Sequence, residues 1–315
     1  MSQQSTSTLL MIKPQGFDYN KETAKDNHFQ TGGKALSSTE ITRRALHEFE
    51  GFVKEISTKG IEVIVYDDIK TKATPDAVFP NNWFSTHNDG TVYLYPMFAP
   101  NRRKERKQEV LDLLTQELGF RIDRIIDWSK HEDKGLFLEG TGSMILDRPN
   151  HIVYASLSER TSEELLEKYA EEIGYELVCF TSHHQVKQKK VLIYHTNVML
   201  CVAKDYAVVC LECITNLTER KAVIDSLNNT NKAIIEVTLD QINHFAGNML
   251  EVHNKANESF LIMSSRAYKK MNQAQIAKIQ LHSKIVHAPL TTIENYGGGS
   301  ARCMLAEIFL PRKEK

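Results

Sequence analysis

The chain has 315 residues, and its 39 Lys and Arg residues nearly balance 40 Asp and Glu residues, which gives a net charge of −1 at pH 7. This balance excludes the bulk positive charge with which proteins bind nucleic acid or an anionic membrane surface, and it favours a small-molecule ligand. No linker rich in Pro, Gly or Ser divides the sequence. We therefore expect a single domain over residues 1–315.

Apolar spacing predicts helices and strands that alternate along the whole chain. A polar segment at residues 17–34 comes first, and we expect an irregular loop there, of the kind that can cover a site. Helices are expected at residues 38–54, 103–118, 161–173, 217–227 and 267–280, and strands at 62–66, 91–95, 151–155, 191–194, 206–211 and 260–263. The alternation predicts an α/β fold.

The five cysteines are odd in number, and four of them lie in or beside apolar runs, as is typical of reduced cysteines. The first residues lack a cationic leader, and no apolar run is long enough to span a bilayer. We expect a cytoplasmic protein with a small-molecule amino-acid substrate and with no nucleic-acid or membrane partner. The sequence leaves a homodimer open.

Five short segments repeat one pattern, in which a small or polar residue precedes an apolar run. They begin at Asn82, Gly142, Asn197, Asn248 and Cys303, so their spacings are 60, 55, 51 and 55 residues. An even repeat of this length is typical of solenoids, propellers or arrays. If the repeats close around an axis, the polar residues that precede the apolar runs meet there.

Cys303 is the strongest candidate for a chemical role. It follows three glycines, Gly297 to Gly299, which allow the backbone to bend sharply and to approach a ligand closely. A thiolate is a strong nucleophile, and the neighbouring Arg302 would favour the ionised form. A lone cysteine is more often a buried structural residue, but the glycine run favours a nucleophile.

His195 and Glu139 stand at equivalent places in their own repeats. His195 ends an apolar run and could move a proton at neutral pH. Glu139 precedes two glycines and would orient the imidazole if the two side chains meet. Taken alone, each would be a core or surface residue.

Arg102 and Arg103 begin a predicted helix, where cations are electrostatically unfavourable, so a carboxylate ligand would explain them. Cys210 and Cys213 have the spacing of metal ligands, but no second pair follows them. There is no glycine pattern for a nucleotide. We expect no metal and no cofactor.

The ordered motifs resemble the guanidino-group-modifying superfamily, which includes arginine deiminase, dimethylarginine dimethylaminohydrolase and the amidinotransferases. The motifs are Phe79-Pro80-Asn81-Asn82, Leu138-Glu139-Gly140, His195-Thr196-Asn197 and Gly297 to Cys303. The resemblance implies a five-bladed α/β propeller of ββαβ repeats, the pentein fold. It also implies Cys303 as nucleophile, His195 as general acid and base, Glu139 as its partner, and substrate binding by Asn81, Asn82 and Asn197 beside Arg102 or Arg103.

Asn82 and Asn197 are amides where the superfamily usually has aspartates. A guanidinium offers only donors and a positive charge, whereas a ureido group is neutral and has a carbonyl acceptor. Two amides suit the ureido group, and unpaired buried polar groups can discriminate between such analogues by about 10⁴-fold. We therefore expect a citrulline-type substrate, as in the citrulline-utilisation hydrolases that the chain resembles.

Three alternatives remain open at this stage. Arginine or another guanidino compound could be the substrate if Asp18, Asp76 or Asp89 supplies the carboxylate. An amidinotransferase would use the same cysteine with an amine in place of water. A binding propeller without catalysis would leave Cys303 unreactive toward a thiol alkylator.

Overall fold

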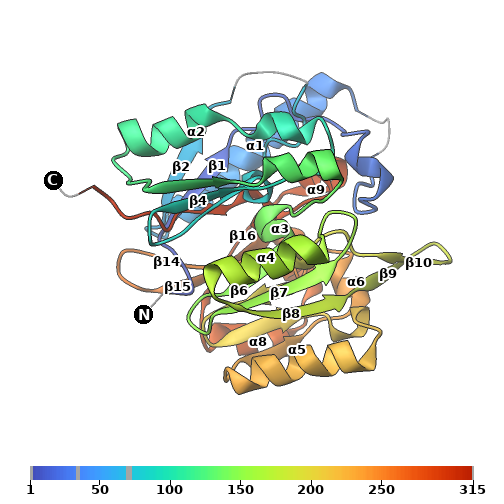
Figure 1. Ribbon diagram of the computed structural model, residues 1–315. Coiled ribbons are helices and arrows are strands. Elements are labelled where there is room, and N and C mark those ends of the chain that lie inside the picture. Colours follow the sequence, from blue (N-terminus) through green and yellow to red (C-terminus); the bar gives the residue numbers. More distant parts are fainter. Residues whose placement is uncertain (1–2, 33–35, 69–72, 314–315) are drawn as a thin grey trace.

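The computed structural model describes residues 3–32, 36–68 and 73–313 (Figure 1). Within these residues the strands form five three-stranded sheets and one two-stranded hairpin. Each sheet has the same plan, in which a middle strand pairs antiparallel with one neighbour and parallel with the other. The predicted α/β fold is thus present as several small sheets.

The three strand positions recur in each sheet. The antiparallel first strands are β3 Phe84–Thr86, β6 Met144–Asp147, β11 Leu200–Val202, β14 Leu250–His253 and β17 Ala306–Glu307. The middle strands are β4 Thr91–Leu94, β7 Ile152–Leu157, β12 Tyr206–Val209, β15 Ser259–Ser264 and β1 Thr8–Ile12. The parallel third strands are β5 Arg124–Asp127, β8 Glu176–Thr181, β13 Ala233–Glu236, β16 Lys284–Ala288 and β2 Glu62–Tyr66.

Helices connect the middle strand of each sheet to its third strand, because a parallel pair needs a crossover. These helices are α1 Ser38–Ser57, α2 Gln108–Asp112, α4 Glu163–Ile173, α5 Leu217–Asn229, and the pair α7 Ser265–Lys270 and α8 Gln273–Gln280. In Figure 1, α1 and α2 lie at the top of the molecule and α5 and α8 at the bottom. The short helices α3 Gly140–Ser143, α6 Leu239–Ile242 and α9 Thr291–Gly297 lie outside the crossovers.

The apolar face of α1 shows how a crossover helix packs against the rest of the molecule. Ile41, Ala45, Phe49, Phe52 and Ile56 recur at helical spacing, and all are buried. Burial of each large side chain contributes about 1.5–3 kcal/mol relative to exposure. The helix begins at the N-cap Ser37, whose side chain accepts a hydrogen bond from the backbone N–H of Glu40.

Two predicted helices are broken in the structure. The helix expected at 103–118 is interrupted at Arg106, whose backbone is extended and whose guanidinium donates to the carbonyl of Tyr95 and to Glu132. The helix expected at 267–280 ends at Met271, and Asn272 then caps α8 through reciprocal hydrogen bonds with Gln275.

The strand expected at 191–194 belongs instead to a hairpin. Strands β9 His183–Val186 and β10 Lys189–Leu192 pair with each other, and the hairpin projects from the rest of the chain in Figure 1. The chain then turns inward, so Ile193 and Tyr194 are buried outside any strand. Across the described ranges, no helix has the length and apolar character needed to cross a membrane.

Candidate active site

The segments that lead into the first strands of the five sheets lie together. They are η2 Pro80–Asn82, α3 Gly140–Ser143, η6 Thr196–Val198, the turn at 245–248 and η8 Ala301–Met304. Asn81 Nδ2 donates to Thr141 Oγ1 at 3.3 Å, and Thr196 Oγ1 donates to the carbonyl of Ser143 at 2.5 Å. These bonds join η2 to α3 and α3 to η6. The predicted meeting of the repeated motifs is therefore present.

Two glycines allow α3 to approach its neighbours closely. Gly140 has φ +47°, and a Cβ added there would lie 2.4 Å from the carbonyl oxygen of Asn81. A Cβ on Gly142 would lie 2.4 Å from Asn82 Nδ2 and 2.8 Å from the ring of His195. Any larger residue at Gly142 would displace Asn82 or His195.

Cys303 lies on η8, with 3% of its surface exposed. Asn248 Nδ2 and Asn197 Nδ2 donate to its Sγ, at 3.3 and 3.5 Å. The expected sharp bend occurs at Gly298, whose φ of +65° ends α9. A Cβ on either flanking glycine would lie 2.8 Å from the ring of Phe79, so the glycines place η8 directly against the segment before η2.

The side chain of Arg302 is directed away from Cys303. Its NH1 donates to the carbonyl of Leu305 at 2.8 Å, and its NH2 pairs with Glu307 at 2.7 Å. The expectation that this guanidinium favours the thiolate is therefore wrong. Hydrogen-bond donors to Sγ come from the two asparagine amides instead.

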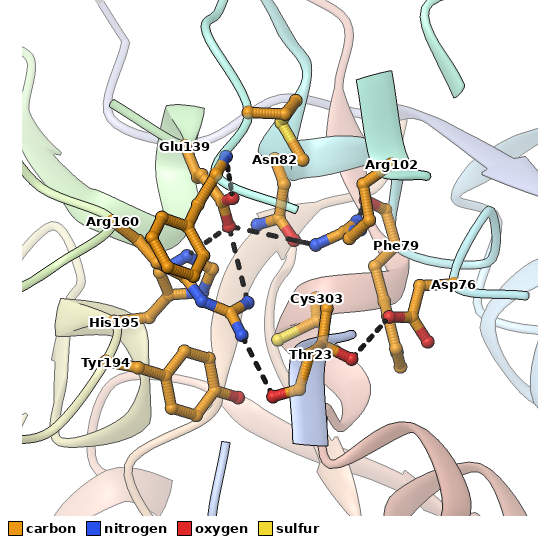
Figure 2. Close-up of polar contacts among 12 residues, drawn as sticks. Thr23, Asp76, Phe79, Asn82, Arg102, Glu139, Arg160, Tyr194, His195 and Cys303 are labelled. Atoms are coloured by element: carbon orange, nitrogen blue, oxygen red, sulfur yellow. Dashed lines mark hydrogen bonds and ion pairs between the residues drawn. The ribbon is translucent and has the colours of Figure 1, made fainter. Parts of the chain in front are cut away.

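Glu139 and His195 form a buried pair. Glu139 Oε2 lies 2.8 Å from His195 Nε2, and Oε1 accepts from the backbone N–H of Phe98 at 2.9 Å. Arg160 and Arg102 approach Oε2 from two sides, at 3.5 and 3.8 Å (Figure 2). Burial alone would raise the pKa of Glu139, but Arg160 and the bond with His195 hold that pKa well below its usual range.

The ionised carboxylate fixes the tautomer of the imidazole. A carboxylate only accepts, so Nε2 of His195 carries the hydrogen and Nδ1 is the basic nitrogen. Burial lowers the pKa of His195 below its usual value, and Glu139 offsets only part of that effect. The imidazole is therefore neutral at pH 7 and can accept a proton.

Arg102 holds Asn82. Its Nε and NH2 donate to Glu105, with the closest N–O distance at 2.9 Å, and its NH1 donates to Asn82 Oδ1 at 2.8 Å. A guanidinium has no acceptor, so the carbonyl of the Asn82 amide must face Arg102. Asn82 Nδ2 then lies on the other side, where it donates to Asn81 Oδ1 at 3.1 Å.

Arg103 does not reach the site. Its Nε donates to the carbonyl of Met97 at 3.1 Å and lies 3.3 Å from Glu132. The side chain is about one third exposed and lies outside the lining of the central cavity. Of the two arginines singled out in the sequence, the structure brings only Arg102 to the other candidates.

Arg160 is a site residue that the sequence analysis missed. It is 1% exposed and donates through Nε and NH2 to both oxygens of Asp26, at 2.6 and 2.7 Å. Its guanidinium also lies over the ring of Tyr194, 4.8 Å from the centroid. A signal was present, because Arg160 stands two residues before the N-cap Ser162 and is as unfavourably placed as Arg102.

Asp76, one of the three aspartates that the sequence leaves open as a source of the carboxylate, lies in the site. It is 2% exposed, and its Oδ2 accepts from Asn20 and Thr23 at 2.7 and 3.1 Å. Its Oδ1 is buried with no hydrogen-bond partner within the described chain. Burial raises the pKa of Asp76. It belongs to no repeated motif, and only the structure distinguishes it from other acids.

These side chains enclose a small central cavity, lined by Asn27, Asp76, Phe79, Asn82, Arg102, Arg160, Tyr194, His195, Gly297, Gly299 and Cys303. Its volume of about 10 Å³ holds at most one water molecule. The segment predicted as a loop, residues 17–34, closes it through Asn20, Thr23, Asp26 and Asn27; Gly33 and Lys34 lie outside the described residues. At this volume the cavity holds an amino acid only if part of its lining moves.

The fold is similar to that of several solved structures. ArgZ, an arginine dihydrolase from the ornithine–ammonia cycle in cyanobacteria, has a TM-score of 0.71 at 19% identity; the alignment covers 97% of this chain and 41% of that one. The N-terminal domain of ArgZ, covalently bound to a reaction intermediate, has the same score and identity, with 96% of this chain and 99% of that chain covered. This chain thus spans less than half of the full-length ArgZ chain.

A dimethylarginine dimethylaminohydrolase, solved as an adduct with S-methyl-L-thiocitrulline, has a TM-score of 0.61 at 14% identity, covering 96% of this chain and 99% of that one. A comparison with curated proteins finds no match. The family model described as N,N dimethylarginine dimethylhydrolase, eukaryotic, matches residues 13–310, nearly the whole chain. The chain therefore belongs to this family, within the guanidino-group-modifying superfamily.

Proposed function

We propose that this protein hydrolyses citrulline to ornithine, carbon dioxide and ammonia. The Cys303 thiol gives its proton to neutral His195 as Sγ attacks the ureido carbon, and the bond from that carbon to the side-chain nitrogen breaks as His195 passes this proton to the departing amine. Ornithine leaves and a carbamoyl thioester remains. Water that has lost a proton to His195 then hydrolyses the thioester, which restores the thiol and releases carbamate. Carbamate decays to carbon dioxide and ammonia.

The orientation of the Asn82 amide is the observation that carries this proposal. Arg102 donates to the Asn82 carbonyl at 2.8 Å, so the opposite side of the amide carries the N–H groups of Nδ2, one of which already donates to Asn81. A guanidinium would face these donors with donors of its own. A ureido carbonyl can accept from them, and a neutral group also leaves no uncompensated buried charge.

The other end of the cavity supports an amino acid as substrate. Arg160 offers a buried guanidinium, which suits an α-carboxylate, and the unpartnered Oδ1 of Asp76 suits an α-ammonium group. Arg102 already has its donors engaged by Glu105, Asn82 and a backbone carbonyl. The donors of Arg160 are engaged by Asp26 and the carbonyl of Thr23, which lie in the covering segment and free these donors when that segment moves, so we assign the α-carboxylate to Arg160.

We further propose that the five sheets are the blades of a five-bladed propeller with the site on its axis. The shared strand order supports this arrangement, because each ββαβ unit contributes the segment before its first strand. Contacts between these segments run from η2 through α3 and η6 to the turn at Asn248, and from there to η8. The approach of the glycine run to Phe79 brings η8 back to η2.

Product analysis tests the proposal. The purified protein is given citrulline or arginine separately, and ornithine, citrulline and ammonia are quantified, with Cys303→Ala as the blank. Ornithine and one ammonia per citrulline, absent in the blank, are the expected result. Citrulline formed from arginine would overturn the argument from Asn82 while keeping Cys303 as nucleophile.

Arginine or a methylated arginine is the second candidate, because the family model describes a dimethylarginine hydrolase and Asp76 places a carboxylate in the cavity. The variant Asn82→Asp separates the two. It replaces a donor by a second acceptor, so it should reduce citrulline turnover by about 100-fold or more without a matching loss of folding. If wild-type protein already prefers arginine, the second candidate replaces the first.

A further inference from the structure

We propose that Asn248 is a further catalytic residue, whose amide donates a hydrogen bond to Cys303 Sγ and stabilises the thiolate. This inference rests on the proposed function in one respect, that Cys303 is the nucleophile. Asn248 begins the fourth repeated motif of the sequence, and the mechanism above gives it no role. Its Nδ2 lies 3.3 Å from Sγ, and its side chain is buried with that of Cys303.

The orientation of the Asn248 amide is determined by its neighbours. The backbone N–H of Arg302 donates to Asn248 Oδ1 at 3.0 Å, so that atom must be the carbonyl oxygen. One hydrogen of Nδ2 goes to the carbonyl of Asn197, also at 3.0 Å. The other hydrogen is left for Sγ, which lies closer to Nδ2 than to Oδ1, at 3.3 against 3.7 Å.

The backbone holds Asn248 in this place. The backbone N–H of Asn248 donates to the carbonyl of Phe245 at 2.9 Å, and Phe245 itself has a φ of +64°, which is uncommon for a residue with a side chain. A Cβ on Gly247 would lie 2.3 Å from the carbonyl oxygen of Val198. The turn is therefore pressed against η6 in a strained conformation that presents Asn248 to Cys303.

A buried thiolate needs such donors. Cys303 is 3% exposed, so water supplies little stabilisation to its charge. The guanidinium of Arg302 is occupied by Leu305 and Glu307 and does not face Sγ. Asn197 Nδ2 is a weaker partner at 3.5 Å. Asn248 thus supplies the shorter of the two side-chain hydrogen bonds to Sγ in the described structure.

The test compares wild-type protein with Asn248→Asp. Aspartate has the same shape and still accepts from Arg302 N–H, but it replaces the donor to Sγ with a negative oxygen. The rate of Cys303 alkylation by iodoacetamide is measured against pH, with labelled peptides identified by mass spectrometry. We expect the midpoint of this profile to move to higher pH by about one unit or more, and kcat/KM at pH 7 to fall at least about tenfold.

A matched control separates chemistry from folding. Asn254 is also buried and holds backbone groups, donating to Lys59 O at 2.9 Å and accepting from the N–H groups of Ala256 and Glu258 at 2.9 and 3.0 Å. Asn254→Ala should lower thermal stability and leave the alkylation profile in place. If Asn248→Asp does not fold, Asn248→Ser, which keeps an acceptor but has no amide donor, is measured in the same way.

The outcomes distinguish this inference from the proposed function. A folded Asn248 variant with the wild-type alkylation profile would overturn the role of Asn248 and leave Cys303 as nucleophile. Wild-type protein that resists alkylation and turns over neither citrulline nor arginine would overturn both.

Discussion

The two ends of the central cavity are built in different ways. The reacting end consists of Asn82, Glu139, His195 and Cys303, which lie in the repeated segments before the first strands. Hydrogen bonds to backbone groups and close approach at glycines hold these segments against one another. The covering end consists of residues 17–32 together with the Arg160 and Asp76 side chains to which they bond. The reacting groups are therefore in position before substrate arrives. Access of substrate to the cavity, by contrast, depends on an irregular segment that side chains hold in place.

Loss of the nucleophile should have the largest effect. Cys303→Ser should reduce turnover by about 10⁴-fold or more, because a hydroxyl ionises far less readily than a thiol. Thermal unfolding should change little, since the two side chains have nearly the same shape. Product formation from citrulline measures the effect. Cys179→Ser, a free cysteine outside the cavity, is the control and should keep its activity.

Glu139→Gln should reduce catalysis at the reacting end without displacing the covering segment, residues 17–32. Turnover should fall by about 10²–10⁴-fold, because the amide no longer orients and stabilises the charged imidazole. Removal of the negative charge lowers the pKa of His195 further, so the acid limb of the residual kcat/KM should move to lower pH. An acid limb that moves to higher pH, measured over pH 5–8, would contradict this account.

Asp26→Asn should loosen the cover and leave the reacting end intact. The variant loses the charge that pairs with Arg160 at 2.6 Å, so the segment should open more often. We expect KM for citrulline to rise about tenfold, with kcat less affected, and Cys303 to be alkylated faster than in wild-type protein. Glu164→Gln, which breaks the exposed pair with Lys168, should change neither quantity.

The smallest of these predicted changes is the effect of Asp76→Asn on stability. Burial raises the folded-state pKa of Asp76 above its unfolded value of 3.8, so wild-type protein loses stability as pH rises from that value through the folded pKa. The amide should therefore be more stable than wild type at pH 7, by a few degrees in Tm, with the gain absent near pH 4. A larger gain at pH 4 than at pH 7 would reverse the sign and overturn the argument.

The sequence predicted the reacting end better than the covering end. The repeated motifs lie on the five segments before the first strands, so Asn82, Glu139, Asn197, His195 and Cys303 could be found by position alone. The α/β alternation was also correct, and strand Glu62–Tyr66 and helix α5 were closely bounded.

The covering end lies outside this repeat. Arg160 and Asp76 meet only through tertiary contacts with Asn20, Thr23 and Asp26 that no local pattern encodes. The sequence also could not predict the direction of each side chain, since Arg102 points into the site and its neighbour Arg103 points away. Helix breaks at Arg106 and Met271 followed from capping and long-range ion pairs that override apolar spacing.

The pairing of β1 with β17 has a consequence for how the protein is made. β1 begins at Thr8, and its antiparallel partner β17 is formed by Ala306 and Glu307, so this pair of strands cannot form until those two residues have been synthesised. Cys303 lies on the turn immediately before that partner. During synthesis on the ribosome, Cys303 therefore emerges after the other four repeated segments, and a nascent chain that stops before it cannot carry out the reaction. Completion of this sheet and the acquisition of activity should therefore coincide, once residues 303–307 have emerged.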